Sequence, residues 1–205
     1  MKFKFKKIIA DNIFIYLLEY DDYDLNEFLY ILNKEEIEKI ETFKSESRKK
    51  EFIAVRILKQ KYLKKHSIKY NKNGAPIIDK GFISISHTKN IVGIAYNKNH
   101  VVGLDIEYER DNIKKISPKF LSDKEITDLT VDSNFEVTKI WSFKEVLYKI
   151  ANLNGIDFKH ELKISKISDQ IYLGEISNNT INLNSKLSFI NYKDLIITFN
   201  ISNCE

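Results

Sequence analysis

Cysteine, proline and glycine are scarce in this sequence: its 205 residues include one cysteine, two prolines and six glycines. The single cysteine, Cys204, excludes an internal disulfide and a cysteine-based metal site, and it fits a reducing compartment. Hydrophobic residues make up 43% of the chain, which is enough to build a core and argues against disorder over most of the length. A chain of this length fits one domain or two small halves that share a core.

Long apolar runs and a one-sided charge are also missing. No stretch approaches the roughly 20 apolar residues of a membrane span, and the apolar run near the charged N-terminus is too short for a signal peptide. The 33 basic and 29 acidic residues leave a formal net charge of only +4, and the lysines are scattered. That distribution does not favour nucleic acid as a partner. We therefore expect a cytoplasmic protein that binds neither nucleic acid nor membrane.

Hydrophobic periodicity predicts a mixed α and β chain. Alternating or compact apolar runs predict strands over residues 3–9, 13–19, 82–87, 91–96, 101–108, 162–167, 170–174, 187–191 and 194–201. Helical spacing predicts helices over residues 25–43 with a break at Asn33, over 46–66, from Ser122 onward and over 138–152. The hairpin pattern of residues 82–96 returns loosely at 187–201, each time after a helix. This repetition suggests two similar halves of about 100 residues.

Two carboxylates share one face of the expected strand at 101–108. Asp105 and Glu107 are two residues apart, so both point away from the face that carries Leu104 and Ile106. Carboxylate oxygens suit Mg²⁺, which is a hard cation. Alternation by itself also predicts a solvent-exposed polar face, and the pair taken alone favours that simpler interpretation.

Glu145 and Lys149 lie one turn apart on the expected helix 138–152. Taken alone, they predict a surface ion pair worth a few tenths of a kcal/mol. A catalytic role requires Glu145 to face the same metal as Asp105 and Glu107, with Lys149 neutralising phosphate oxygens. Phosphoryl transfer depends mainly on positioning and charge neutralisation, and a serine nucleophile needs a nearby base.

Four side chains earlier in the chain are candidates for binding phosphate. His87 ends a Ser-Ile-Ser-His strand, where it and Ser86 can donate hydrogen bonds, although a lone histidine is more often structural. Arg48 and Arg56 project broadly to one side of the expected helix 46–66. Arg56 has apolar neighbours, and a guanidinium beside a buried edge usually takes an anionic partner.

Taken in order, six segments resemble the motifs of 4′-phosphopantetheinyl transferases of the surfactin-synthetase-activating (Sfp) type. The most specific are residues 103–107, Gly-Leu-Asp-Ile-Glu, and residues 141–149, Trp-Ser-Phe-Lys-Glu-Val-Leu-Tyr-Lys. The other four are the helix from Arg48 to Arg56, Gly74-Ala75-Pro76, Ser86-His87-Thr88 and Phe120-Leu121-Ser122 followed by Glu125. The resemblance covers roughly half of the chain, from about residue 40 to about residue 150.

The resemblance implies an enzyme that moves the 4′-phosphopantetheine group of coenzyme A onto a serine of an apo carrier protein and releases 3′,5′-ADP. It implies Mg²⁺ as cofactor and an acyl, polyketide or peptidyl carrier protein as partner. The implied fold is α+β, with two similar halves in a pseudo-two-fold arrangement and a cleft between them. We place the half that binds coenzyme A phosphates at residues 1–100 and the metal-binding half at 101–205, and we expect a monomer.

Matched position by position, the resemblance also implies the site residues. The implied metal ligands are Asp105, Glu107 and Glu145. The implied catalytic residues are Glu145 as general base, Lys149 at the leaving phosphate, and His87. The implied coenzyme A contacts are Arg48, Arg56, Gly74, Pro76, Ser86, His87 and Lys149.

One position departs from the family pattern. Ala75 stands where the family's Gly-Lys-Pro motif has lysine, so a cation expected near coenzyme A is missing. Lys72 and Lys44 are the candidate substitutes for that charge.

Two other functions would use some of the same residues. A Mg²⁺-dependent phosphohydrolase with these carboxylates would release phosphate from a nucleotide without an acceptor protein. The lack of a P-loop or other Gly-rich phosphate cradle argues against a nucleotide triphosphatase. A non-enzymatic module that binds carrier proteins or nucleic acid would keep its function after Asp105→Ala and Glu145→Ala.

Overall fold

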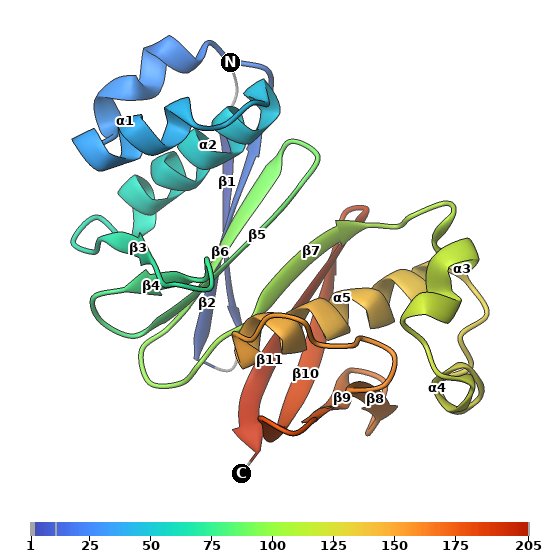
Figure 1. Cartoon of the computed structure of the whole chain (residues 1–205). Coiled ribbons are helices and arrows are strands. Elements are labelled where there is room, and N and C mark those ends of the chain that lie inside the picture. Colours follow the sequence, from blue (N-terminus) through green and yellow to red (C-terminus); the bar gives the residue numbers. More distant parts are fainter. Residues whose placement is uncertain (1–2, 11, 205) are drawn as a thin grey trace.

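The larger strands of the protein form two antiparallel sheets, and each sheet packs against one long helix (Figure 1). This arrangement comes from a computed structural model, which describes residues 3–10 and 12–204. The fold is α+β, as the sequence predicted. In the part of the chain that is described, no helix is both long and apolar enough to cross a membrane.

The first sheet has four strands. Across the sheet they run β1 (Phe3–Ala10), β2 (Ile13–Tyr20), β6 (Ile91–Asn97) and β5 (Phe82–Thr88). Helix α2 (Glu46–Tyr62) packs on this sheet, and its buried apolar residues are Phe52, Ile53, Ala54, Val55 and Leu58. Before α2 come the 3₁₀ helix η1 (Leu25–Ile31) and α1 (Lys34–Glu41), and after it the ribbon of β3 (Ile68–Tyr70) and β4 (Pro76–Ile78).

Capping side chains set the helix boundaries in this part of the chain. The side chain of Asn33 accepts a hydrogen bond from the backbone N–H of Glu36, and the backbone N–H of Asn33 donates to the Glu36 carboxylate. The predicted break at Asn33 is therefore the N-cap of α1. Ser45 is the N-cap of α2, and this helix begins at its predicted first residue, Glu46. The predicted helix 46–66 ends earlier, at Tyr62, because Leu63 leaves helical geometry and the chain turns toward β3.

The second sheet has five strands and a helix laid across it. The strands run β7 (Leu104–Tyr108), β11 (Leu195–Cys204), β10 (Asn182–Tyr192), β9 (Ile171–Ser177) and β8 (Leu162–Lys166). The buried residues of helix α5 (Asn134–Ala151) include Ile140, Phe143, Leu147 and Ile150. Between β7 and α5 lie α3 (Ile113–Ile116), the 3₁₀ helix η2 (Ser117–Lys119) and α4 (Asp123–Asp128). Helix α5 begins before the predicted residue 138 because Ser133 caps it through the N–H of Glu136.

The two sheets meet where the edge strand β5 lies beside the edge strand β7 (Figure 1). Two serine hydroxyls of β5 accept backbone hydrogen bonds from β7: Ser84 from Leu104 at 3.0 Å and Ser86 from Ile106 at 3.1 Å. A shared core lies beside this joint, and its buried residues from both sheets are Ile13, Ile15, Leu17, Ile91, Ala95, Val102, Leu104, Ile106, Leu195, Ile197 and Phe199. The division into residues 1–100 and 101–205, and the pseudo-two-fold relation, stay predictions.

Candidate functional site

Asp105 is held by three donors at the joint between the sheets. The carboxylate, which is 5% exposed, accepts hydrogen bonds from the hydroxyls of Ser86 at 3.0 Å and Ser142 at 2.7 Å. Lys149 on α5 forms an ion pair with it at 2.8 Å and also donates to the carbonyl of Leu104 at 2.7 Å. Asp105 is therefore fixed by side chains from β5 and α5, and Lys149 supplies its counter-charge.

Glu107, the next carboxylate on this strand, is paired with Arg110. The guanidinium contacts both carboxylate oxygens, with Nε at 3.3 Å from one of them. Burial and the nearby charge of Asp105 raise the pKa of Glu107, while Arg110 and the indole N–H of Trp141 act in the opposite direction. The indole nitrogen of Trp141 is buried and has no hydrogen bond of normal geometry. It therefore lies near the Glu107 carboxylate without forming a full hydrogen bond to it.

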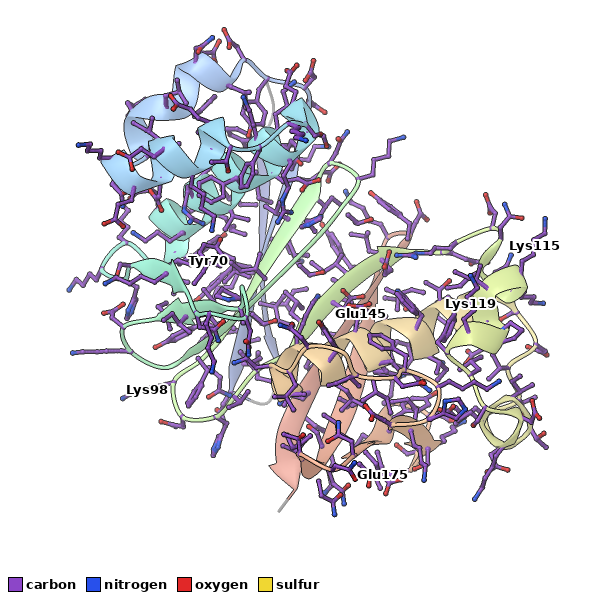
Figure 2. The ribbon with its side chains drawn as sticks, viewed as in Figure 1. Tyr70, Lys98, Lys115, Lys119, Glu145 and Glu175 are labelled. Carbon is purple, nitrogen blue, oxygen red and sulfur yellow. The ribbon has the colours of Figure 1, made fainter. Side chains whose placement is uncertain are left out.

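Glu145 lies on α5 beside β7, near the middle of the molecule (Figure 2). Its pKa is raised to about 7, chiefly by burial and also by the charges of Asp105 and Glu107, against the opposing effect of Lys149 and Arg110. A carboxyl with this pKa exchanges a proton readily at neutral pH, which is what a general base or acid needs. The charges of Asp105 and Glu107 therefore both act on Glu145, while their sharing of one metal ion stays a prediction.

Gly103 allows α5 to approach β7 closely enough to form this group. A Cβ atom at this position would lie 2.8 Å from the carbonyl oxygen of Val146 and 3.0 Å from Ile150. The backbone N–H of Gly103 donates to the buried side chain of Asn200 at 2.7 Å, which fixes the start of the strand. The glycine of the Gly-Leu-Asp-Ile-Glu segment is therefore needed for helix–strand packing.

Lys144, next to Glu145, has a supporting role that the sequence analysis did not predict. Its side chain is fully buried, and the ammonium group pairs with Glu125 at 2.9 Å. It also donates to the backbone carbonyls of Phe120, Phe158 and Leu162 at 2.6 to 2.9 Å. The signal was present in the sequence, because the residues three and four positions away on the helix are all apolar: Ile140, Trp141, Leu147 and Tyr148.

Ser122, where a helix start was predicted, forms a capping box with Glu125 at the start of α4. Glu125 does more than cap, because it is 5% exposed and also accepts from the backbone N–H of Ile164 at 3.0 Å. Together with Lys144, this carboxylate ties α4, α5 and β8 into one unit. The helix that carries Glu145 is therefore anchored from its buried side.

His87 and Arg48 come together at the end of β5. Arg48 donates to the imidazole Nε2 at 2.7 Å and pairs with Glu51 at 3.0 Å. Burial lowers the pKa of His87, Arg48 and Lys149 lower it further, and Glu51 and Asp105 oppose them. The charges of Asp105 and Lys149 therefore act on the imidazole of His87. Arg48 is largely exposed, so an anionic ligand can reach its guanidinium.

Arg56 lies elsewhere on α2, in a buried environment. It is 3% exposed, its Nε donates to Glu36 at 2.6 Å, and its guanidinium stacks on the ring of Phe52 at 4.1 Å. The anionic partner predicted for this arginine is therefore present inside the protein. The structure does not bring Arg56 into contact with Arg48 or His87.

A cavity of about 530 Å³ lies between the turn after β3 and the C-terminal end of α5. Its lining includes Gly74, Pro76 and Lys149, three of the predicted site residues, and Lys149 is the one that also pairs with Asp105. The turn is tied to α5 by Asn152, whose carbonyl and amide oxygens accept from Asn73 at 2.6 Å and from Asn71 at 3.2 Å. Much of the remaining lining is apolar, as ligand cavities commonly are.

The three carboxylates fit Mg²⁺ by their chemistry and charge. They are hard oxygen donors, and burial together with the charge of Asp105 raises the pKa of both Glu107 and Glu145. As the described side chains stand, no group of three or more His, Cys, Asp or Glu residues is close enough to ligate one metal ion. Asp105 is paired with Lys149 instead, and Glu107 with Arg110.

Residues 101–199, just under half of the chain, match the family model described as the 4′-phosphopantetheinyl transferase superfamily. The matched stretch includes Asp105, Glu107, Glu145 and Lys149. A search of curated proteins finds no match to the chain. The family match supports a transferase that acts with coenzyme A on carrier proteins.

Proposed function

We propose that this protein is an Sfp-type 4′-phosphopantetheinyl transferase, which uses coenzyme A and Mg²⁺ to modify a serine of an apo carrier protein. The observation that carries the proposal is that the charges of Asp105 and Glu107 act on Glu145 at the joint between the sheets, beside a cavity lined by Lys149, which is paired with Asp105. A diphosphate bound in that cavity would meet both a positive charge and the oxygen ligands of a divalent cation.

In this mechanism, Asp105, Glu107 and Glu145 would hold Mg²⁺, which when bound would neutralise charge on the diphosphate. Glu145 takes the proton from the carrier serine as its oxygen forms a bond to the phosphorus on the pantetheine side. The bond from that phosphorus to the bridging oxygen breaks, and 3′,5′-ADP leaves with the electron pair. Lys149 stabilises and protonates the leaving phosphate. The hydroxyls of Ser86 and Ser142 keep Asp105 oriented.

Coenzyme A would lie between the two sheets. We propose that Arg48 and His87 contact its phosphates and that Gly74 and Pro76 border it in the cavity. In addition to phosphate contact, His87 would take part in catalysis, because the charges of Asp105 and Lys149 act on its imidazole. Because Ala75 supplies no charge, Lys72 or Lys44 would replace the family's lysine.

Arg56 and Ser86, the other expected coenzyme A contacts, have internal partners. The buried pair of Arg56 and Glu36 joins α2 to α1, and the Ser86 hydroxyl joins β5 to Asp105. We propose that these two residues support the coenzyme A site by holding Arg48 and His87 in place. The partner would be an acyl, polyketide or peptidyl carrier protein, and the enzyme would act as a cytoplasmic monomer with halves at residues 1–100 and 101–205.

The test of this function compares products with and without an acceptor. The protein is incubated with coenzyme A and Mg²⁺, either alone or with a panel of apo carrier proteins, and the products are measured by mass spectrometry. Transferase activity predicts 3′,5′-ADP only when a carrier is present, and none with Asp105→Ala. Phosphate release without a carrier would favour a phosphohydrolase instead. Carrier binding that survives Asp105→Ala without any transfer would favour a binding module.

A further inference from the structure

The carboxylate cluster already contains two positive side chains. Lys149 contacts Asp105 at 2.8 Å, and Arg110 contacts both oxygens of Glu107. The cluster is therefore partly neutralised by the protein itself.

Each of these cations is positioned so that it can leave its carboxylate. The side chain of Arg110 is 42% exposed and that of Lys149 is 25% exposed, so water can solvate both when they are released. Lys149 lines the cavity, where its ammonium would face a bound anion. Asp105 would keep two hydrogen bonds, from Ser86 and Ser142, after Lys149 moved away.

We propose that Arg110 and Lys149 act as built-in counter-ions of the metal-free protein and that a divalent cation displaces them from Asp105 and Glu107. This inference rests on the proposed function for the identity of the metal site. The exchange conserves charge, since one divalent ion replaces two monovalent groups. It assigns Arg110 a role as a competitor for the metal, and it makes Lys149 available to phosphate only once the metal has bound.

The exchange predicts that removal of a counter-ion strengthens metal binding. An exposed ion pair contributes up to about 1 kcal/mol, so Arg110→Gln should tighten Mg²⁺ binding about 2- to 5-fold when no coenzyme A is present. Lys149→Gln should tighten it as well, and coenzyme A should then enhance metal binding less than in the wild type. Isothermal titration calorimetry with Mg²⁺ alone, and then with coenzyme A added, measures both effects.

Lys115→Gln is the matched control, because it removes the same charge from an exposed position on α3, away from Glu145 (Figure 2). Trp141 gives a second readout, since it is the only tryptophan and the guanidinium of Arg110 lies 5.6 Å from its ring. Mg²⁺ should change the fluorescence of the wild type, and the change should be smaller in Arg110→Gln. Unchanged or weaker metal affinity in Arg110→Gln, or equal tightening in Lys115→Gln, would overturn the exchange.

The test of this counter-ion exchange and the test of the proposed function can give different results. Transfer by the wild type, combined with unchanged Mg²⁺ affinity in Arg110→Gln, rejects the exchange and leaves the transferase in place. Tighter Mg²⁺ binding by Arg110→Gln, without modification of any carrier, supports the exchange and rejects the transferase.

Discussion

Glu145 should destabilise the metal-free protein at neutral pH while being essential for transfer. Its pKa is raised from an ordinary value of 4.5 to about 7, chiefly by burial. Below the ordinary pKa of 4.5, the carboxyl is protonated in both the folded and the unfolded state, and it does not lower folding stability. As the pH rises toward 7, the unfolded chain releases the proton first, so folding stability falls. Above pH 7 the loss of folding stability has reached its full size and no longer changes with pH.

The size of this cost follows from the shift in pKa. A shift from 4.5 to about 7, at about 1.36 kcal/mol for each pH unit, corresponds to about 3 kcal/mol. Glu145→Gln keeps the shape of the protonated side chain and removes the ionisation, so it should recover this free energy above pH 7. For a chain of this length, about 3 kcal/mol corresponds to a rise in Tm of about 6–12 °C.

Thermal unfolding of the wild type and of Glu145→Gln, at pH 5 and pH 8 and with a chelator present, measures this effect. The variant should be more stable at pH 8, much less stabilised at pH 5, and inactive in transfer. Glu175→Gln, on β9 and distant from Glu145 (Figure 2), controls for the substitution itself. A Glu145→Gln variant that is less stable than the wild type at pH 8, or equally shifted at both pH values, would refute this view of the site.

Two further predictions concern packing around α5. Gly103→Ala places a Cβ atom 2.8 Å from the carbonyl of Val146, so it should lower stability by about 1–3 kcal/mol and reduce transfer, as denaturant unfolding and initial rates would show; stability equal to the wild type would contradict the close contact. Lys144→Met leaves Glu125 buried without its ion-pair partner and should cost about 3–5 kcal/mol. Adding Glu125→Gln should recover part of that loss, and no recovery would mean that the pair is not the cause.

Much of the fold could be predicted from the sequence because its local signals are strong. The hairpin of β5 and β6 and the break at Asn33 follow from alternation and from capping chemistry. Boundaries were less certain. Helix α2 ends before its predicted limit and α5 begins before its own, because caps and tertiary contacts decide where a helical pattern stops.

The site could be predicted only in part, because its chemistry depends on pairs far apart in the sequence. The alternation in β7 placed Asp105 and Glu107 on one face, but it could not show that Lys149 and Arg110 neutralise them. The polar face expected from alternation is not solvent-exposed at Asp105, since β5 covers it. Periodicity locates a side chain on an element, whereas its partner depends on how the sheets meet.

Charged residues that serve the core were the hardest to recognise. Arg56 resembled a phosphate-binding residue, and its internal partner Glu36 lies on another helix. Lys144 looked like a neighbour of the catalytic carboxylate, yet it is fully buried and binds Glu125. Buried ion pairs of this kind need excellent geometry to offset the loss of hydration, and sequence spacing does not report geometry.

The most direct test of the central claim is the intact mass of an apo carrier protein after incubation with this protein, coenzyme A and Mg²⁺. The account predicts a gain of one phosphopantetheine group on the carrier, abolished by a chelator or by Glu145→Ala. An unchanged carrier mass across fatty-acid, polyketide and peptide-synthetase carriers, with folded enzyme and excess Mg²⁺, would contradict it.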